Sequence, residues 1–219
     1  MNRPLAAVLF DLDGTLVSTK KLYLEAYRRA LEAQLQRMPT VEEIIALRPR
    51  AELRFLRDLV PPDVYDACLR DFRRFYAELH ASHFGGIYDG VAEMLGGLRS
   101  GGTRLGLVTG KSRASWEVMV GHVELGPFEV TVFDDDVRQP KPDPEGLRLA
   151  VDALGIEPAA AAYVGDAMSD VEAAAAAGML PVAALWPKKP TEVEAFAAQA
   201  GEAGAVTART PADVVRLTG

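Results

Sequence analysis

Hydrophobic and polar positions alternate along the chain in blocks that predict buried strands separated by helices. Short apolar runs containing β-branched residues occur at 6–10, 104–108, 130–133, 161–164 and 180–185. Such runs are typical of strands buried on both faces of a parallel sheet. Helical spacing occurs before the Gly101-Gly102 and Gly155 stops, again at 191–200, and in a last short helix after Thr210-Pro211. The alternation predicts an α/β, doubly wound, Rossmann-like core.

Residues 18–86 break this pattern because they contain no convincing strand. Tyr23, Tyr27 and Leu31 share one helical face, while Phe72 and Tyr76 belong to another. We therefore predict an all-helical module inserted after the first strand. Residues 1–17 and 87–219 would form the α/β core, residues 18–86 the helical insertion, and the glycine pair at 85–86 would lie near the return hinge.

Composition and charge argue against some classes of partner. The net charge is −7 and the basic residues are scattered, so the chain has no concentrated basic patch that would bind nucleic acid. No stretch approaches a membrane span or a signal sequence, so we expect a cytoplasmic protein. We also expect it to be a monomer or weak homodimer.

The single cysteine, Cys68, lies in an apolar series typical of a buried residue. His80, His83 and His122 lack ligand spacing, and we expect them at surface or packing positions.

Polar residues follow the predicted strands where each apolar run ends. Asp11 and Asp13 follow the first run, Thr109 follows the second, and Asp166 follows the run at 161–164. In an open parallel sheet these ends lie on one edge, where ligands bind. Carboxylates gathered there repel one another unless a divalent cation joins them, and Mg²⁺ prefers oxygen ligands. The pattern therefore predicts a magnesium site at this edge.

The aspartates divide into two pairs with different tasks. Asp11 and Asp13 can both face the cleft as alternate residues leaving a strand, and Gly14 permits a tight departure of the backbone. One can act as nucleophile and the other as acid and base. Asp166 and Asp170 lie four residues apart, hence on one helical face. We expect Asp166 to ligate the metal and Asp170 to support it.

Phosphoryl transfer also needs cations and hydrogen-bond donors around the equatorial oxygens. Thr109 and Lys141 are suited to this task, and the prolines on either side of Lys141 stiffen its loop. Gly110 and Lys111 begin a predicted helix whose backbone amides can hold phosphate oxygens. The spacing around them does not match a nucleotide-binding P-loop, which has four residues between its glycines instead of the three found here.

These motifs resemble, in content and order, those of the haloacid dehalogenase superfamily in its phosphatase branch, and residues 18–86 resemble its first-type cap. The resemblance implies an aspartyl-phosphate intermediate on Asp11, acid and base work by Asp13, and phosphate contacts from Thr109 and Lys141. It also implies Mg²⁺ on Asp11, the Asp13 carbonyl and Asp166. Dehalogenases of the superfamily lack the second aspartate, so Asp13 favours phosphoryl chemistry. The matching segments are Phe10 to Leu16, Val108 to Gly110, Lys141 to Pro144 and Gly165 to Asp170.

The chain departs from many relatives at three places. Ser18-Thr19 stands where an Asp-Ser pair is common, Asp89 where proline is common, and Ala167 where serine or threonine is common. None of these changes removes a catalytic group. The first lies at the hinge into the cap, so the substrate subfamily stays open.

The predicted cap carries arginines that could contact the substrate. Arg50, Arg54 and Arg57 share one helical face, and arginine binds carboxylate or phosphate groups bidentately. The alternative is a solvated face balanced by Glu52 and Asp58, which we favour for Arg54 and Arg57. Arg50 lies near the position where relatives such as β-phosphoglucomutase use a cap arginine. It is our candidate for substrate binding, beside Gly110 and Lys111.

We predict a Mg²⁺-dependent hydrolase of a small anionic phosphate monoester, with phosphoglycolate-like metabolites the leading candidates by resemblance. The cap should close over Asp11 and exclude water. A phosphomutase uses the same motifs and passes the phosphoryl group to a sugar hydroxyl, so the sequence leaves it open. A non-catalytic phosphoacceptor domain is a third alternative. Such receivers typically place their acids on different strands and lack an insertion of this size.

Overall fold

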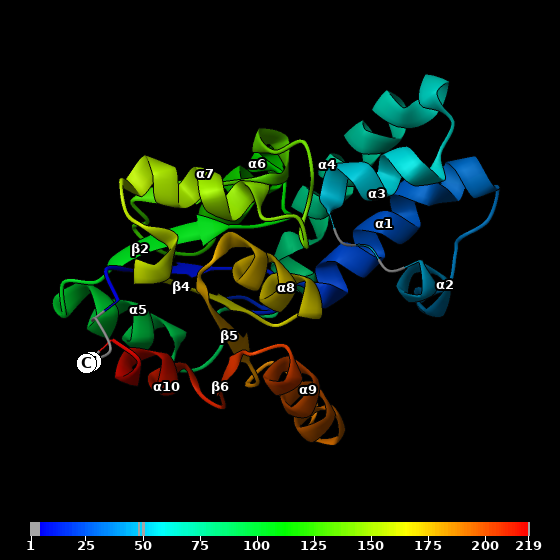
Figure 1. Cartoon of the computed structure of the whole chain (residues 1–219). Helices are drawn as coiled ribbons and strands as arrows, with labels where there is room; N and C mark the ends of the chain where they lie inside the picture. Colours follow the sequence, from blue (N-terminus) through cyan, green and yellow to red (C-terminus); the bar gives the residue numbers. More distant parts are fainter. Residues whose placement is uncertain (1–4, 48, 50, 219) are drawn as a thin grey trace.

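A six-stranded parallel sheet forms the centre of the fold (Figure 1). The computed structural model describes residues 5–47, 49 and 51–218. Neighbouring strands follow the order β3-β2-β1-β4-β5-β6, and each pairing is parallel. This arrangement confirms the predicted doubly wound core. The strands are β1 (Ala7–Phe10), β2 (Arg104–Val108), β3 (Val130–Val132), β4 (Ala161–Gly165), β5 (Leu180–Ala184) and β6 (Val206–Ala208).

Helices cover both faces of the sheet because its central strands are apolar on both sides. Val8 and Phe10 of β1 pack toward α5 (Val91–Ser100), α6 (Arg113–Val120) and α10 (Pro211–Arg216). Ala7 and Leu9 pack toward α7 (Glu145–Leu154) and α8 (Met168–Ala177) on the other face. Helix α9 (Pro190–Glu202) packs Ala200 near β5, and two short 3-10 helices, η1 (Asp134–Asp136) and η2 (Pro158–Ala160), complete the core.

The sequence pattern missed one strand. The five predicted apolar runs form β1 to β5, but β6 has only three residues at the edge of the sheet. Val206 and Thr207 are exposed, and only Ala208 is buried. An edge strand this short carries too little apolar periodicity to be recognised from its residues alone.

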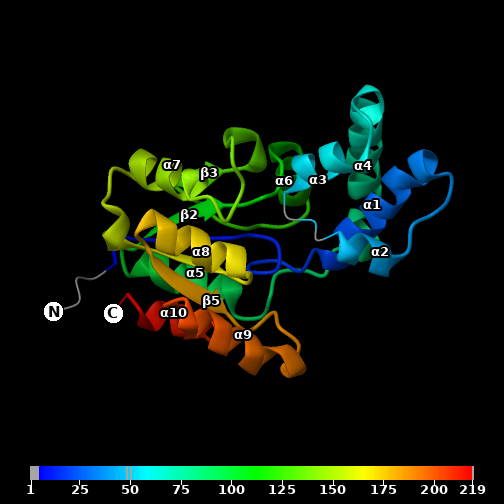
Figure 2. The same cartoon turned by 45° about the vertical axis from the view of Figure 1, so that its right-hand side comes forward.

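Four helices stand together at one end of the molecule, beyond the end of β1 (Figures 1 and 2). They are α1 (Lys20–Leu35), α2 (Val41–Ala46), α3 (Glu52–Leu59) and α4 (Pro62–His83). Their own core includes Tyr27 stacked on Phe72, with ring centroids 4.7 Å apart, and the buried thiol of Cys68. The helical cap is therefore a separate packing unit inserted into the chain.

The chain enters and leaves the cap through two segments that are hydrogen-bonded to each other. Ser18 donates its backbone N–H to the Gly86 carbonyl, and Gly85 donates to the Ser18 carbonyl, at 2.9 Å and 2.8 Å. A Cβ on Gly85 would lie 2.6 Å from Ser18 Oγ, so this close approach requires glycine. We propose that the domain boundaries fall here, with residues 1–17 and 87–219 as the core and 18–86 as the cap.

Within the described ranges, no helix has the length and apolar content needed to cross a membrane.

Candidate active site

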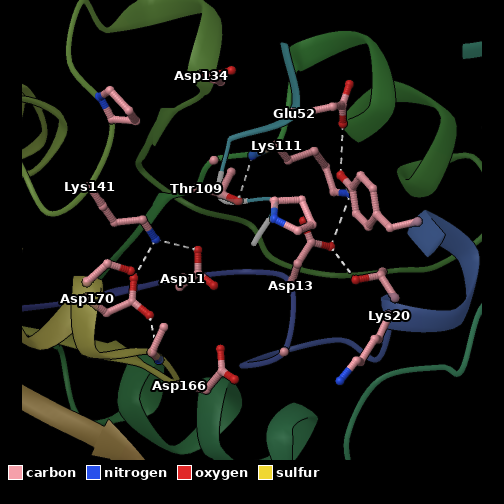
Figure 3. Close-up of a pocket in the computed structure, with 18 of the residues that line it drawn as sticks. Asp11, Asp13, Lys20, Glu52, Thr109, Lys111, Asp134, Lys141, Asp166 and Asp170 are labelled. Atoms are coloured by element: carbon pink, nitrogen blue, oxygen red, sulfur yellow. Dashed lines mark hydrogen bonds and ion pairs between the residues drawn. The ribbon is translucent and has the colours of Figure 1, made fainter. Parts of the chain in front are cut away.

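The predicted polar residues meet in one cavity between the sheet edge and the cap (Figure 3). Asp11 follows β1, Thr109 follows β2 and Asp166 follows β4, as expected for the ends of parallel strands. The cavity has a volume of about 530 Å³. Tyr23, on α1, contributes to its wall from the cap side. A cavity of this size, closed by two domains, suits a small ligand.

Lys141 holds two of the carboxylates together. Its ammonium lies 2.8 Å from Asp11 Oδ1 and 2.6 Å from Asp170 Oδ1, and it donates to the Tyr163 hydroxyl at 2.8 Å. Tyr163 in turn donates to the Val108 carbonyl at 2.7 Å. Burial acts to lower the pKa of Lys141, but the neighbouring Asp11 and Asp170 raise it overall, so the ammonium stays charged. Lys141 thus supplies a fixed positive charge beside Asp11.

Three carboxylates gather closely enough to share one cation. An oxygen from each of Asp11, Asp166 and Asp170 lies within 4.8 Å of the other two. Burial raises the pKa of Asp11 to about 7, although Lys141 opposes the rise. Burial likewise raises the pKa of Asp166, against the influence of Lys188. Grouped carboxylate oxygens fit a hard divalent cation, because its charge would stabilise the anionic forms of Asp11 and Asp166, which burial disfavours.

Asp166 is held on two sides. Lys188, in the loop after β5, lies with its ammonium 2.8 Å from Asp166 Oδ2 and 4.6 Å from the centre of the Phe196 ring. Gly14 approaches from the other side with φ of +89°, and a Cβ there would lie 2.8 Å from Asp166 Oδ1. Glycine is therefore required at position 14 for two reasons. It adopts the left-handed turn, and it leaves room for the Asp166 carboxylate. No local pattern predicts that Lys188 reaches Asp166, because the two residues are 22 positions apart in the chain.

Each carboxylate oxygen of Asp170 accepts a hydrogen bond from a different partner. Its Oδ2 accepts the backbone N–H of Ala167 at 3.0 Å, as an acid at the start of a helix commonly does. Its Oδ1 accepts from Lys141. Both oxygens of Asp170 thus have partners, and its role in supporting the metal stays a prediction.

Asp13 faces the cap side of the cavity, away from Lys141 (Figure 3). Its Oδ1 accepts the Thr19 hydroxyl at 2.7 Å and lies 3.1 Å from the Lys111 ammonium. Thr19 is one of the two hinge residues at which the chain departs from many relatives. The Thr19 hydroxyl thus joins the hinge directly to Asp13.

Thr109, Gly110 and Lys111 form a turn against the cavity wall. Thr109 is not the N-cap of the following helix, since Ser112 takes that place by accepting the Ser115 N–H. The Thr109 hydroxyl instead accepts the Lys111 backbone N–H at 3.2 Å. The Lys111 side chain is fully buried, and the roles predicted for these three residues toward phosphate stay predictions.

Glu52 was misjudged from the sequence. We expected it to balance a solvated arginine face, but the residue is only 2% exposed, and its carboxylate accepts hydrogen bonds from Tyr23, Ser112 and Ser115. Burial raises the pKa of Glu52, although Lys111 opposes the rise. No local signal could have revealed this, because its side-chain partners lie 29 to 63 positions away along the chain.

The three cap arginines differ in their surroundings. Arg50 lies outside the described residues, so its role in substrate binding stays a prediction. Arg54 is not simply solvated, because it pairs with the buried Asp134 at 3.3 Å and donates to the Val137 carbonyl at 2.7 Å. Arg57 is exposed and lies 5.3 Å from the centre of the Tyr65 ring. Arg54 is thus a cap residue docked on the core.

Comparison with known proteins agrees with the geometry. The family model for haloacid dehalogenase-like hydrolases matches residues 8–184. Pyrophosphatase PpaX of Bacillus velezensis is 33% identical over 187 residues, which cover 84% of this chain and 85% of the relative. The plasmid-encoded phosphoglycolate phosphatase of Cupriavidus necator is 39% identical over 184 residues, covering 80% and 79%.

A solved structure shares the whole fold. CbbY from Rhodobacter sphaeroides, in complex with phosphate, superposes with a TM-score of 0.76 at 23% identity and covers 96% of each chain. At that identity the likeness supports the fold alone. The family model and the two relatives, each aligned over most of its own length, carry the assignment further. The chain belongs to the haloacid dehalogenase-like hydrolases and is a phosphohydrolase of that family.

Proposed function

We propose that this protein is a Mg²⁺-dependent phosphatase that hydrolyses a small anionic phosphate monoester through an aspartyl-phosphate on Asp11. One observation carries the proposal. Asp11 stands at the meeting point of an ammonium, on Lys141, and a group of carboxylates able to hold a cation. A carboxylate so placed can attack a phosphorus atom whose charge is neutralised from both sides.

The metal would be held by Asp11, the Asp13 backbone carbonyl and Asp166, with Asp170 in a supporting position. The bound ion supplies charge neutralisation for the phosphoryl oxygens. Lys141 neutralises further charge from its position beside Asp11 Oδ1. Thr109 and the Gly110 amide stand at the cavity wall, where they can donate to phosphoryl oxygens.

Asp13 would serve as the acid and base. It can protonate the leaving oxygen when the phosphoryl group moves to Asp11, and then take a proton from the water that hydrolyses the aspartyl-phosphate. Its place on the cap side of the cavity, near Lys111, supports this role, because a leaving group between core and cap would lie beside it. A closed cap would keep bulk water from the first step.

The substrate would be a compact metabolite with a second anionic group. The chain is acidic overall, yet five lysines line the cavity: Lys20, Lys111, Lys141, Lys188 and Lys189. Lys20 and Lys189 are exposed, so their charges are free to meet a ligand at the opening. Phosphoglycolate carries a phosphate and a carboxylate, and it stays our leading candidate. Inorganic pyrophosphate has a similar size and charge, and PpaX is a pyrophosphatase.

Phosphate release with Mg²⁺ from phosphoglycolate, pyrophosphate, p-nitrophenyl phosphate and sugar monophosphates would test the proposal. We expect turnover that EDTA abolishes and that Asp11→Asn reduces to the uncatalysed background. Asp152→Asn, the same change at an exposed position on α7, is the matched control and should retain full activity. If Asp11→Asn retained the wild-type rate, Asp11 would not be the nucleophile. Isomerised sugar phosphate without free phosphate would identify a mutase, and a persistent phosphoprotein without turnover would identify a signalling domain.

A further inference from the structure

A buried polar network links the cap to the core beside Asp13. It contains Glu52, Tyr23 and Tyr76 from the cap, and Lys111 from the core. The proposed chemistry uses Asp13 but assigns no task to this network. An inference about its task rests on the proposed function, because it concerns the acid role of Asp13.

Glu52 joins the two domains through both of its carboxylate oxygens. Its Oε1 accepts the hydroxyls of Ser112 and Ser115, which belong to the core at the start of α6, with Ser115 at 2.9 Å. Its Oε2 accepts the hydroxyl of Tyr23, a cap residue, at 2.8 Å. The Glu52 backbone N–H donates to the core carbonyl of Gly110 at 3.0 Å. The carboxylate is therefore satisfied only while the start of α3 lies against the core.

The Lys111 ammonium contacts acceptors in both domains. Its ammonium donates to the Tyr23 and Tyr76 hydroxyls at 2.6 Å and 2.9 Å, and it lies 3.1 Å from Asp13 Oδ1. The three N–H groups of an ammonium match these three acceptors. Since the side chain is fully buried, no water competes for them. The position of the ammonium is thus set by two cap hydroxyls and by Asp13 together.

A line of contacts then runs from Glu52 through Tyr23 and Lys111 to Asp13. Tyr23 donates its only proton to Glu52, which leaves its oxygen lone pairs to accept from Lys111. If residue 52 could not accept this hydrogen bond, the Tyr23 hydroxyl would have to rotate. Its proton would then turn toward the Lys111 ammonium, which the lone pairs of the Tyr23 oxygen now face. The orientation of the Tyr23 hydroxyl, and so the position of Lys111, depends on Glu52.

We propose that Glu52 is a positioning residue for proton transfer. Through Tyr23 it holds Lys111 so that the Asp13 carboxyl is fixed toward the leaving group only when the cap lies on the core. Glu52 touches neither the substrate nor the reacting atoms. Its effect is on the acid that protonates the leaving oxygen.

Arg54 provides a matched comparison within the same helix. It also joins α3 to the core, through Asp134 and the Val137 carbonyl, and Asp134 accepts the Leu53 backbone N–H at 3.1 Å. These contacts hold the cap without touching Tyr23 or Lys111. Loss of Arg54 therefore weakens cap docking alone, whereas loss of Glu52 should also disturb Asp13.

The experiment compares kcat/KM for phenyl phosphate and p-nitrophenyl phosphate. The two esters have similar shapes, but phenolate is a strong base that needs a proton as it leaves, whereas p-nitrophenolate leaves readily without one. The ratio of the two values reports on the acid, because weaker substrate binding lowers both together. Asp13→Asn should shift this ratio by about 100-fold in favour of p-nitrophenyl phosphate.

We expect Glu52→Met, which removes both acceptor oxygens, and Tyr23→Phe to shift the ratio in the same direction by about tenfold each, a fraction of the full acid effect. The double variant should shift it no further than the single ones, since both break one line of contacts. Arg54→Met should lower both values and leave the ratio unchanged. Circular dichroism and thermal unfolding would confirm folding, and Tyr23→Phe carries the test if Glu52→Met does not fold.

Two results would overturn the inference, and they differ in meaning. If Asp13→Asn shifts the ratio but Glu52→Met and Tyr23→Phe do not, Glu52 only holds the cap, and the proposed function stands. If Asp13→Asn leaves the ratio unchanged, the acid role itself is wrong, and the proposal for Glu52 is lost with it.

Discussion

His80 should make the stability of this protein depend on pH in a way that one substitution removes. The residue lies on α4 and is 1% exposed. Its ring stacks between Phe84 and His122, with centroids 4.6 Å and 4.4 Å away, and meets the edge of Tyr76. Its Nε2 has no hydrogen-bond partner in the described part of the chain. His122 follows α6, so this stack joins the cap to the core.

Burial, with smaller effects from the charges on His122 and Lys111, lowers the pKa of His80 from 6.5 to about 4. Between these values the unfolded chain binds a proton at this residue and the folded chain does not. The free energy of unfolding therefore falls as the pH drops from 6.5 toward 4, with no further loss from His80 below that. At pH 5 the loss amounts to about 2 kcal/mol, at about 1.4 kcal/mol per pKa unit.

Urea unfolding of the wild type and His80→Phe, at pH 7.5 and pH 5.0, would measure this contribution. Phenylalanine keeps the stack and removes the titrating ring. Buried carboxyls with raised pKa values, such as Asp11 and Asp166, stabilise the fold as the pH falls, so the two proteins must be compared at each pH. His83→Phe is the matched control, because Nδ1 of His83 lies 2.8 Å from Ser82 Oγ and not in an apolar stack.

We expect the difference in unfolding free energy between wild type and His80→Phe to shift by about 2 kcal/mol from pH 7.5 to pH 5.0, in favour of the variant. His83→Phe should show no comparable shift. If the His80→Phe difference stays constant within about 0.5 kcal/mol, His80 is not held neutral by its burial, and the reasoning fails.

Three further changes have defined outcomes. Lys141→Met should abolish turnover. It should also lower the free energy of unfolding, measured in urea, by about 3 kcal/mol, because Asp11 and Asp170 lose their shared counter-ion. Unchanged stability would contradict the role of Lys141 as that counter-ion. Mg²⁺ at 100 times its dissociation constant should stabilise the wild type by about 2.7 kcal/mol in thermal unfolding, and Asp166→Asn should lose most of this gain. Gly14→Ala should cost at least about 1 kcal/mol, since φ is +89° and the new Cβ would press on Asp166; a neutral effect would show that the turn relaxes freely.

Much of the site could be predicted because one topological rule brings it together. Asp11, Thr109 and Asp166 each end a strand, and parallel strands put such residues on one edge of the sheet. The same apolar runs that mark the strands therefore mark the site. Lys141 was recognisable from its proline-flanked loop and its place in the motif order. Short segments with little apolar content, such as β6, could not be predicted from the same pattern.

The cap could be predicted as a helical insertion but not in its contacts. Helical periodicity shows which residues face inward, and Tyr27, Phe72 and Tyr76 are indeed buried together. It does not show which polar residues the neighbouring domain covers. Glu52 looked like a solvated charge because its neighbours along α3 are charged, and only the docking of α3 on the core buries it.

The sequence by itself determined the sheet, the existence of the helical cap and the gathering of carboxylates at the strand ends. Local periodicity and chain topology are enough for these, because they depend on residues close in sequence or on the ends of strands. Only the tertiary structure decided that Lys111 is buried between Tyr23, Tyr76 and Asp13, and that Lys188 reaches Asp166. Such contacts depend on how the cap and the connecting loops pack onto the core, and residues far apart in the sequence carry no local signal of that packing.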